Sequence, residues 1–228
     1  MSNIGRRGSH QQMALLLLIH FPLVCFSDEA DSNKFFISGS FIAGISEVDD
    51  IQASGAIAGA PRESDMDDAV GGFAGGVGYQ WNQFLIEAEY LWRYRFDFDN
   101  RFAVGPTGIK SDVESQSVML NLTWHFYDEW LLKPYIGGGI GWIENDADTK
   151  RTNLGTGAVT NIDTSTDDVT WALMAGVIYP INSDWVVKVG YRYADLGEIE
   201  MGPFADGGKV TVEEYDSHDF TLSVLYFF

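Results

Sequence analysis

The sequence predicts an all-β protein, a transmembrane antiparallel up-and-down β-barrel of about eight strands with short turns at one end and long loops at the other. Two observations support this fold class. Segments in which apolar side chains occupy every second position recur along the chain, and the connections between them alternate between short and long. The segment that runs from Asp219 to the aromatic Phe228 shows the alternation most clearly, and no further domain is expected after it.

The first residues are typical of a secretory signal peptide. Arg6 and Arg7 precede an apolar run over residues 13–26, and Ser27 supplies a small residue at the usual cleavage spacing. The run is too short and too interrupted to cross a bilayer as a helix, which takes about 20 apolar residues. We therefore expect cleavage after Ser27.

This interpretation divides the chain into a signal peptide, residues 1–27, and an outer-membrane barrel domain, residues 28–228. A membrane anchor is a weaker alternative, and so is a lipoprotein signal at Cys25, because Val24 stands where a small residue belongs. Cleavage removes Cys25, the single cysteine of the chain. The mature protein is then expected to need no disulfide and to bind no metal through sulfur.

Length, hydropathy and charge narrow the class further. A chain of 228 residues suits one domain of ordinary size after the signal peptide is removed. The mean hydropathy of -0.06 excludes a helical membrane bundle, whereas it fits a barrel in which only alternate residues meet lipid. The net charge of -19 argues against nucleic acid as a partner, because a phosphate backbone attracts clustered lysine and arginine.

The alternation places eight strands, near residues 33–45, 69–81, 84–97, 113–126, 133–143, 168–180, 185–195 and 215–228. The short connections are expected at residues 82–83, 128–132 and 181–184, and the long polar ones at 46–68, 98–112, 144–167 and 196–214. Both ends of the barrel domain fall on the short-turn side. This asymmetry is that of a bacterial outer-membrane barrel, with tight periplasmic turns and extended external loops.

Aromatic residues gather at both ends of the expected strands, as expected for rings that prefer the membrane-water interface. The girdle on the short-turn side is expected to contain Phe35, Tyr79, Trp81, Phe84, Trp124, Phe126, Tyr135, Tyr179, Trp185, Tyr226 and Phe228. The girdle on the long-loop side is expected to contain Trp92, Tyr94, Phe96, Trp142, Trp171, Tyr191 and Tyr193.

Alternation alone does not say which face meets lipid, because a soluble barrel also alternates. Size decides: Ile140 and Trp142 oppose Gly139 and Gly141 on one strand, and the other strands repeat the contrast. Small residues suit the crowded interior of an eight-stranded barrel, whereas the aromatic residues could not all fit inside it. We therefore place the bulky apolar face in lipid.

This orientation turns a set of charged residues into the lumen. The set consists of Glu87, Glu89, Arg93, Arg95, Lys188 and Arg192. Buried charges must be paired, so we expect a carboxylate-guanidinium network that plugs the barrel. An ion path is the alternative, and the narrow lumen favours the packed network.

Three fragments resemble the opacity-protein-like and OmpA-like transmembrane families of outer-membrane β-barrels. They are Lys133-Pro-Tyr-Ile-Gly-Gly-Gly-Ile-Gly-Trp142, Val187-Lys-Val-Gly-Tyr-Arg-Tyr-Ala-Asp-Leu-Gly197 and the closing strand to Phe228. The closing strand has Ser223, Leu225 and Phe227 where the family usually has glycine and alternating basic residues. The resemblance implies a Gram-negative surface antigen, often an adhesin or a factor acting against host defences, without a cofactor.

The outward residues of the closing strand are expected to serve as the membrane insertion signal that the barrel-assembly machinery meets. They are Phe220, Leu222, Val224, Tyr226 and Phe228. The other expected partners are outer-membrane lipid, lipopolysaccharide, and host surface or serum proteins.

The long loops are expected to carry function, and they are acidic. Their carboxylates are Glu47, Asp49, Asp50, Glu63, Asp65, Asp67, Asp68, Glu144, Asp146, Asp148, Asp163, Asp167, Asp168, Glu198, Glu200, Asp206, Glu213, Glu214 and Asp216. Divalent-cation binding is one interpretation, but no run has the spacing of a calcium loop, so a solvated surface is favoured.

No catalytic, metal or cofactor site is expected. A serine-histidine site would need His218 or His125, but residues next to each other on a strand point to opposite faces, so Ser217, His218 and Asp219 cannot form a triad among themselves. We therefore expect a non-enzymatic adhesin-type surface protein. The alternative is a small porin-like channel for ions or hydrophobic compounds.

Overall fold

A computed structural model describes residues 33–57, 66–102, 107–126 and 131–228. The expected signal peptide lies outside the described residues. The elements are β1 (Lys34–Ser54), the short 3-10 helix η2 (Gly55–Ile57), β2 (Met66–Trp81), β3 (Phe84–Phe102), β4 (Thr107–His125), β5 (Lys133–Asn153), β6 (Val159–Pro180), β7 (Trp185–Asp195), β8 (Ile199–Met201) and β9 (Lys209–Phe227). Among the described residues, no helix is long and apolar enough to cross a membrane.

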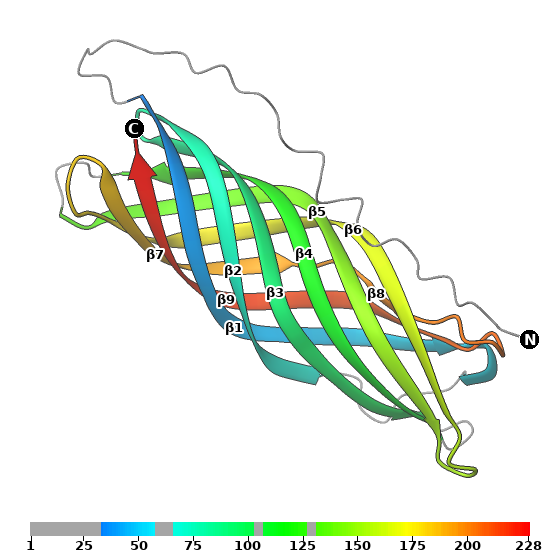
Figure 1. The fold of residues 1–228 in the computed structure, drawn as a ribbon. Coiled ribbons are helices and arrows are strands. Elements are labelled where there is room, and N and C mark those ends of the chain that lie inside the picture. The colour runs from blue at the N-terminus through cyan, green and yellow to red at the C-terminus, as the bar shows by residue number, and fades with distance from the viewer. Residues whose placement is uncertain (1–32, 58–65, 103–106, 127–130) are drawn as a thin grey trace, which may run out of the picture. The chain divides into compact units, whose positions relative to one another are not determined.

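The strands form one closed antiparallel ring (Figure 1). Each strand from β1 to β6 pairs with the next, β7 pairs with β9, and β9 returns to β1 from Phe36↔Phe227 to Ser54↔Lys209. The short β8 continues the register that β7 makes with β9, so the two act as one interrupted strand. The ring therefore has eight strand positions, and the predicted all-β up-and-down barrel is confirmed.

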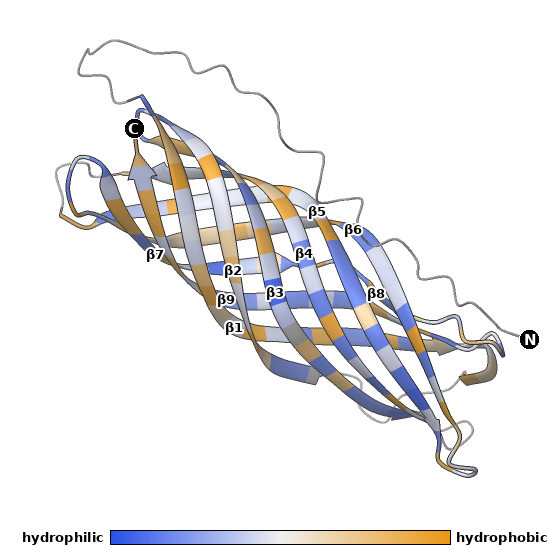
Figure 2. Cartoon of the chain, viewed as in Figure 1, coloured by the Kyte–Doolittle hydropathy of each residue, from blue (hydrophilic) through white to orange (hydrophobic). Residues whose placement is uncertain are grey.

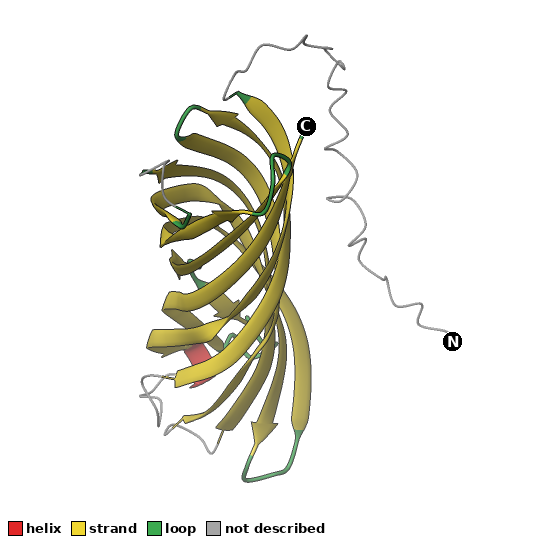
Figure 3. Cartoon of the chain, turned by 90° about the vertical axis from the view of Figure 1, so that its left-hand side faces the viewer, coloured by secondary structure: helices red, strands yellow, loops and turns green. Residues whose placement is uncertain are grey.

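The tight turns lie where the alternation breaks. Asn82 and Gln83 connect β2 to β3, and Asn82 has the left-handed φ of 52° that a two-residue hairpin turn requires. Residues 181–184 connect β6 to β7, where the Asn182 side chain accepts hydrogen bonds from the backbone of Asp184 and Trp185. Figure 3 shows the strands as a curved wall with short turns. The third predicted turn lies mostly outside the described residues.

The predicted long loops are mostly wrong, because the strands continue through them. β5 extends to Asn153 and β6 starts at Val159, so residues 144–153 and 159–167 are strand. The alternation persists there with its polarity inverted: Glu144 and Asp146 point outward while Ile143 and Ala147 are buried. This is the pattern of a sheet in water, and Figure 2 shows the hydrophilic stretches of β4 and β5 beyond the apolar band.

Within the apolar band the orientation is as predicted. Ile140 is 61% exposed and Trp142 is 72% exposed on the outside, whereas Glu89 and Arg192 are each 4% exposed in the lumen. A band of large apolar side chains exposed to water around the whole ring would be energetically unfavourable. This surface therefore contacts the hydrocarbon of the membrane.

Two of the aromatic residues predicted for the outer girdles, Phe96 and Tyr135, lie inside the barrel. Phe96 is fully buried because the β3–β4 register shifts between Arg93 and Phe96, which exchanges the two faces of β3 beyond that point. Tyr135 is 2% exposed and fills lumen space that two glycines leave open. A Cβ on Gly176 or Gly190 would collide with the Tyr135 ring or hydroxyl.

Candidate functional site: the filled lumen and the acidic outer wall

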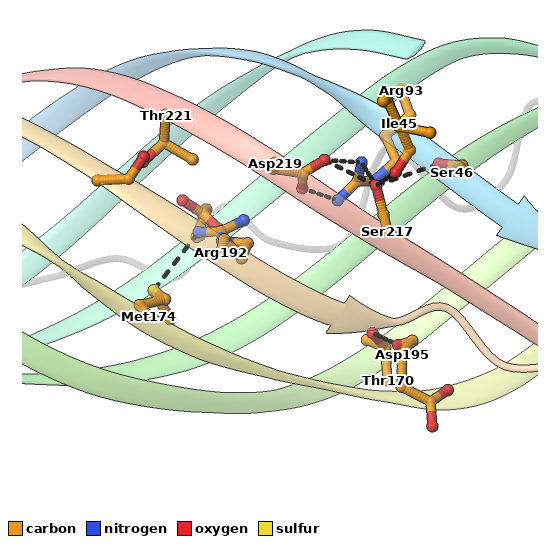
Figure 4. Close-up of polar contacts among 12 residues, drawn as sticks. Ile45, Ser46, Arg93, Thr170, Met174, Arg192, Asp195, Ser217, Asp219 and Thr221 are labelled. Atoms are coloured by element: carbon orange, nitrogen blue, oxygen red, sulfur yellow. Dashed lines mark hydrogen bonds and ion pairs between the residues drawn. The ribbon is translucent and has the colours of Figure 1, made fainter. Parts of the chain in front are cut away.

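A buried ion pair joins β3 to β9 in the middle of the lumen (Figure 4). The two terminal nitrogens of Arg93 donate to the two carboxylate oxygens of Asp219, at 3.0 and 2.5 Å. Ser217 donates to Asp219 at 2.7 Å and accepts from Arg93 at 3.1 Å. Arg93 is 2% exposed and Asp219 is fully buried, so the two charges compensate each other away from water.

Two further ion pairs lie between β3 and β7. Arg192 contacts Glu89 at 2.8 Å, and the Asn121 amide donates to the same carboxylate at 3.2 Å. Lys188 lies 3.6 Å from Glu87, which also accepts a hydrogen bond from Ser38. These contacts link strands on different sides of the ring across the lumen.

The geometry thus brings together five of the six charged residues predicted for the lumen: Glu87, Glu89, Arg93, Lys188 and Arg192. The side chain of Arg95 lies outside the described residues. Asp219, which was not predicted for the lumen network, is a further partner of this set. Asp219 lies on the inward face of the closing strand, whereas Phe220 and Leu222 lie on the outward face. The alternation along this strand could therefore have predicted that Asp219 faces the lumen.

Apolar side chains close the lumen on both sides of the charges. Phe36, Leu85, Leu225 and Phe227 are buried at the short-turn end. A larger cluster fills the other end and contains Val48, Ile51, Ile57, Phe96, Phe98, Ile109, Val113, Ile143, Ala147, Ile199, Met201, Phe204, Val210, Val212 and Tyr215. The described side chains therefore fill the barrel along its length, as the small radius of an eight-stranded ring predicts.

The outer wall beyond the apolar band is acidic. Most of the predicted loop carboxylates described here lie on strand extensions, with Glu47 and Asp49 on β1 and the pairs Glu144↔Asp167 and Asp148↔Asp163 across β5 and β6. Glu63 and Asp65 lie outside the described residues. Within the described ranges, no group of three or more histidine, cysteine, aspartate or glutamate side chains is placed to hold a metal ion.

The residues considered for catalysis are on opposite faces of the wall. Ser217 is fully buried in the lumen beside Arg93 and Asp219. His218 faces outward, where its Nδ1 lies 2.5 Å from the Tyr191 hydroxyl. His125 is buried near the short-turn end of β4. No pair of these serine and histidine side chains meets in the described structure.

A closed eight-position ring, an apolar outer band and a packed polar lumen define the protein as an outer-membrane β-barrel. The sequence matches the family described as the outer membrane protein beta-barrel domain over residues 20–228, and the chain belongs to that family. The protein is located in the outer membrane.

Solved barrels of the same class share the fold. The crystal structure of Neisserial surface protein A is 16% identical with a TM-score of 0.53, covering 85% of this chain and 97% of that chain. The crystal structure of OprG from Pseudomonas aeruginosa is 16% identical with a TM-score of 0.55, covering 87% of this chain and 97% of that chain. At these identities the likeness concerns the fold alone. No curated protein matches the sequence.

Proposed function

We propose that the protein is a non-enzymatic surface antigen of adhesin type, which binds a host surface or serum protein through the outer wall of its extracellular end. One observation carries the proposal: beyond the apolar band the wall has its carboxylates outside and a packed apolar core inside. The interior of this end is therefore occupied, and the surface that remains for binding is the exterior.

The porin-like channel is the competing function. Arg93, Asp219, Glu89 and Arg192 cross the lumen at mid-height, and apolar side chains pack above and below them. Passage of an ion or a hydrophobic compound would have to displace these contacts. Conductance of the refolded protein in planar bilayers separates the two functions, and we expect no channel openings.

Two contacts support the non-enzymatic part of the proposal. Ser217 is held by Arg93 and Asp219 inside the wall, whereas His218 contacts Tyr191 outside it. Acyl transfer would need the serine and the histidine within hydrogen-bond reach of each other. Lipid hydrolysis that is lost in His218→Ala would contradict the proposal.

The binding test is display and grafting. Cells that display the protein should retain host matrix or serum proteins, and cells that display a variant with the outward carboxylates of β5 and β6 changed to amides should retain less. The binding residues lie on strand extensions, so a graft must carry the paired ends of β5 and β6 together to keep their register. Binding that does not follow the graft would contradict the proposal.

Membrane lipid, lipopolysaccharide and the barrel-assembly machinery are proposed partners of the apolar band. Phe220, Leu222 and Val224 are exposed on the outward face of β9, where Tyr226 is partly exposed, and Phe228 is exposed directly after the strand. We propose that these five residues act as the insertion signal. Phe228→Ala should lower the amount of assembled barrel in the outer membrane, whereas Phe227→Ala, inside the lumen, should act on stability instead.

A further inference from the structure

The wall of the barrel changes its construction between β6 and the segment that follows β7. The backbone ladder between β6 and β7 ends at the pair Trp171↔Asp195. Residues 159–170 of β6 are all within the described structure, and their ladder runs to β5 alone. We call residues 196–208 the strap and the gap between the strap and β6 the seam.

Side chains replace the backbone ladder across the seam. The backbone N–H groups of Glu198, Glu200 and Gly202 donate to the side chains of Asp168, Thr166 and Thr164, at 3.1, 3.2 and 3.3 Å. The paired residues occur at every second position along both segments, and they follow the same register that β6 makes with β7. The strap is therefore aligned with β6 but held a side chain's length away from it.

Contacts from the lumen side hold the strap in this position. The Asn145 amide donates to the backbone oxygens of Leu196 and Glu198, at 2.9 and 3.1 Å, and Ile199 and Met201 are buried in the apolar core. Gly197 has a φ of 73°, and a Cβ there would collide with Asp168. β8 pairs with β9. The strap is thus bound to β9 and to the core more firmly than to β6.

Solvent reaches the seam. At Thr170, where the ladder ends, the hydroxyl bonds to the Asp195 backbone oxygen (Figure 4). Beyond it, the inward-facing Ile162, Thr164 and Thr166 are partly exposed, whereas Ile143 and Ala147 on the neighbouring β5 are almost completely buried. A strand edge without a ladder presents N–H and C=O groups that another strand can pair with.

The seam is lined by negative charge. Asp163 and Asp167 are exposed on the outward face of β6, and Glu198 is exposed on the strap. Lys209 is already paired with Glu200, and Arg151 with Asp206. A strand that enters the seam would therefore be attracted if it carries lysine or arginine at alternate positions.

We propose that the seam is a strand-addition site, in which an extended basic segment of a partner protein pairs with the edge of β6 between residues 159 and 170. The incoming backbone replaces the hydrogen bonds that Thr164, Thr166 and Asp168 make to the strap, while the ladder between β8 and β9 keeps the strap attached. This inference rests on the proposed surface-binding function and names the chemistry of the partner.

The test uses a fluorescent decapeptide of alternating lysine and valine and the full-length protein in phosphatidylcholine vesicles, with protein-free vesicles as background. Two control peptides accompany it: one has glutamate in place of lysine, and the other keeps lysine but carries N-methyl groups on alternate residues, which removes ladder donors. We expect the first peptide to bind at least tenfold more tightly than either control, measured by fluorescence anisotropy.

A second arm closes the seam. In the variant Thr166→Cys with Glu200→Cys, made together with Cys25→Ser so that no other thiol reacts, a short bis-maleimide cross-link should abolish the binding of the basic peptide that the same variant shows before cross-linking. Equal binding of the N-methylated peptide, or binding that persists after cross-linking, would overturn the strand-addition site in favour of general attraction to carboxylates.

Retention of host proteins by cells that display the protein tests the strand-addition site and the proposed surface-binding function separately. Cells that display the uncross-linked protein should retain host proteins, and closing the seam should remove that retention. Retention that survives cross-linking overturns the seam and leaves the surface function standing. Failure of the unmodified protein to retain any host protein overturns the proposed function, whatever the peptide does.

Discussion

Arg93 on β3 and Asp219 on β9 are paired through both carboxylate oxygens at the centre of the barrel, at 3.0 and 2.5 Å. The two strands are not ladder partners, because β1 and β2 lie between them along the ring. The pair therefore links two strands that share no backbone ladder through the lumen. Because neither side chain reaches water, each charge depends on the other for its compensation.

Removing one partner should cost more than removing both. Arg93→Leu or Asp219→Leu alone leaves a buried charge, so we expect a loss of about 3–5 kcal/mol in the free energy of unfolding, whereas the double substitution should be closer to the parent. Urea unfolding in lipid vesicles, followed by tryptophan fluorescence, measures all three variants. Additive losses in the double variant would show that the pair is not the reason for the single-site effects.

Glu89 and Arg192 make a second test, by exchange of charge. Glu89→Arg places two guanidinium groups together and Arg192→Glu places two carboxylates together, so each should destabilise the barrel. The double variant again has opposite charges at these two positions, which are 2.8 Å apart at their nearest side-chain atoms in the parent protein. Its folding should therefore recover in part. The fraction of barrel that stays compact on an unheated detergent gel measures the recovery. Single variants as stable as the parent would exclude the pair from the lumen network.

The sequence predicted the strands where they meet lipid, because there the two faces of each strand differ in size. Ile140 and Trp142 against Gly139 and Gly141 could be assigned to lipid and lumen without any structure. The charged lumen residues followed from the same alternation. Asp219 could have been included by the same rule, since it shares the inward face of β9 with Ser217 and Thr221.

The strand ends could not be predicted in this way. Beyond Trp142 the outward residues become acidic, and an acidic stretch such as 144–153 has the composition of a loop as well as that of a strand in water. The reversal of Phe96 depends on a local register shift, and the seam depends on how the strap is held by Asn145, a partner distant in sequence. Neither leaves a local pattern that alternation alone would reveal.

The outward residues are apolar within the apolar band and acidic beyond it. The cost of adding a charged side chain to the outer surface should therefore depend on whether the position lies inside or outside this band. Leu120 is 57% exposed on the lipid face of β4, so Leu120→Arg should cost about 2–4 kcal/mol in the free energy of unfolding from a bilayer. Asp146→Arg lies on the outward face of β5 beyond the apolar band, opposite Glu114, and should be neutral or slightly stabilising. Urea titration in vesicles compares them. Equal costs at both sites would place the membrane boundary elsewhere.

The contact between Arg151 and Asp206 predicts how acid acts on the strap. Arg151 donates to both oxygens of Asp206 at 2.8 and 2.7 Å, and its guanidinium lies 5.0 Å from the centroid of the Phe204 ring. The hydrogen bonds from Arg151, and then the one from the Gly208 backbone, hold the pKa of Asp206 below its ordinary value of 3.8. The charged carboxylate is thus the form that holds the strap to β5.

A carboxyl group with a lowered pKa in the folded state stabilises that state above its ordinary pKa, and the contribution is lost as the pH falls through the lowered folded value. Asp206→Asn should therefore increase amide exchange at Gly207 and Gly208 at pH 7, and the ratio of variant to parent exchange should approach one as the pH falls below the ordinary carboxyl pKa and through the lowered value of the folded state. Glu213→Gln, at an exposed carboxylate on β9, is the matched control and should leave the ratio near one throughout. A ratio for Asp206→Asn that does not change with pH would show that the charge of Asp206 does not hold the strap.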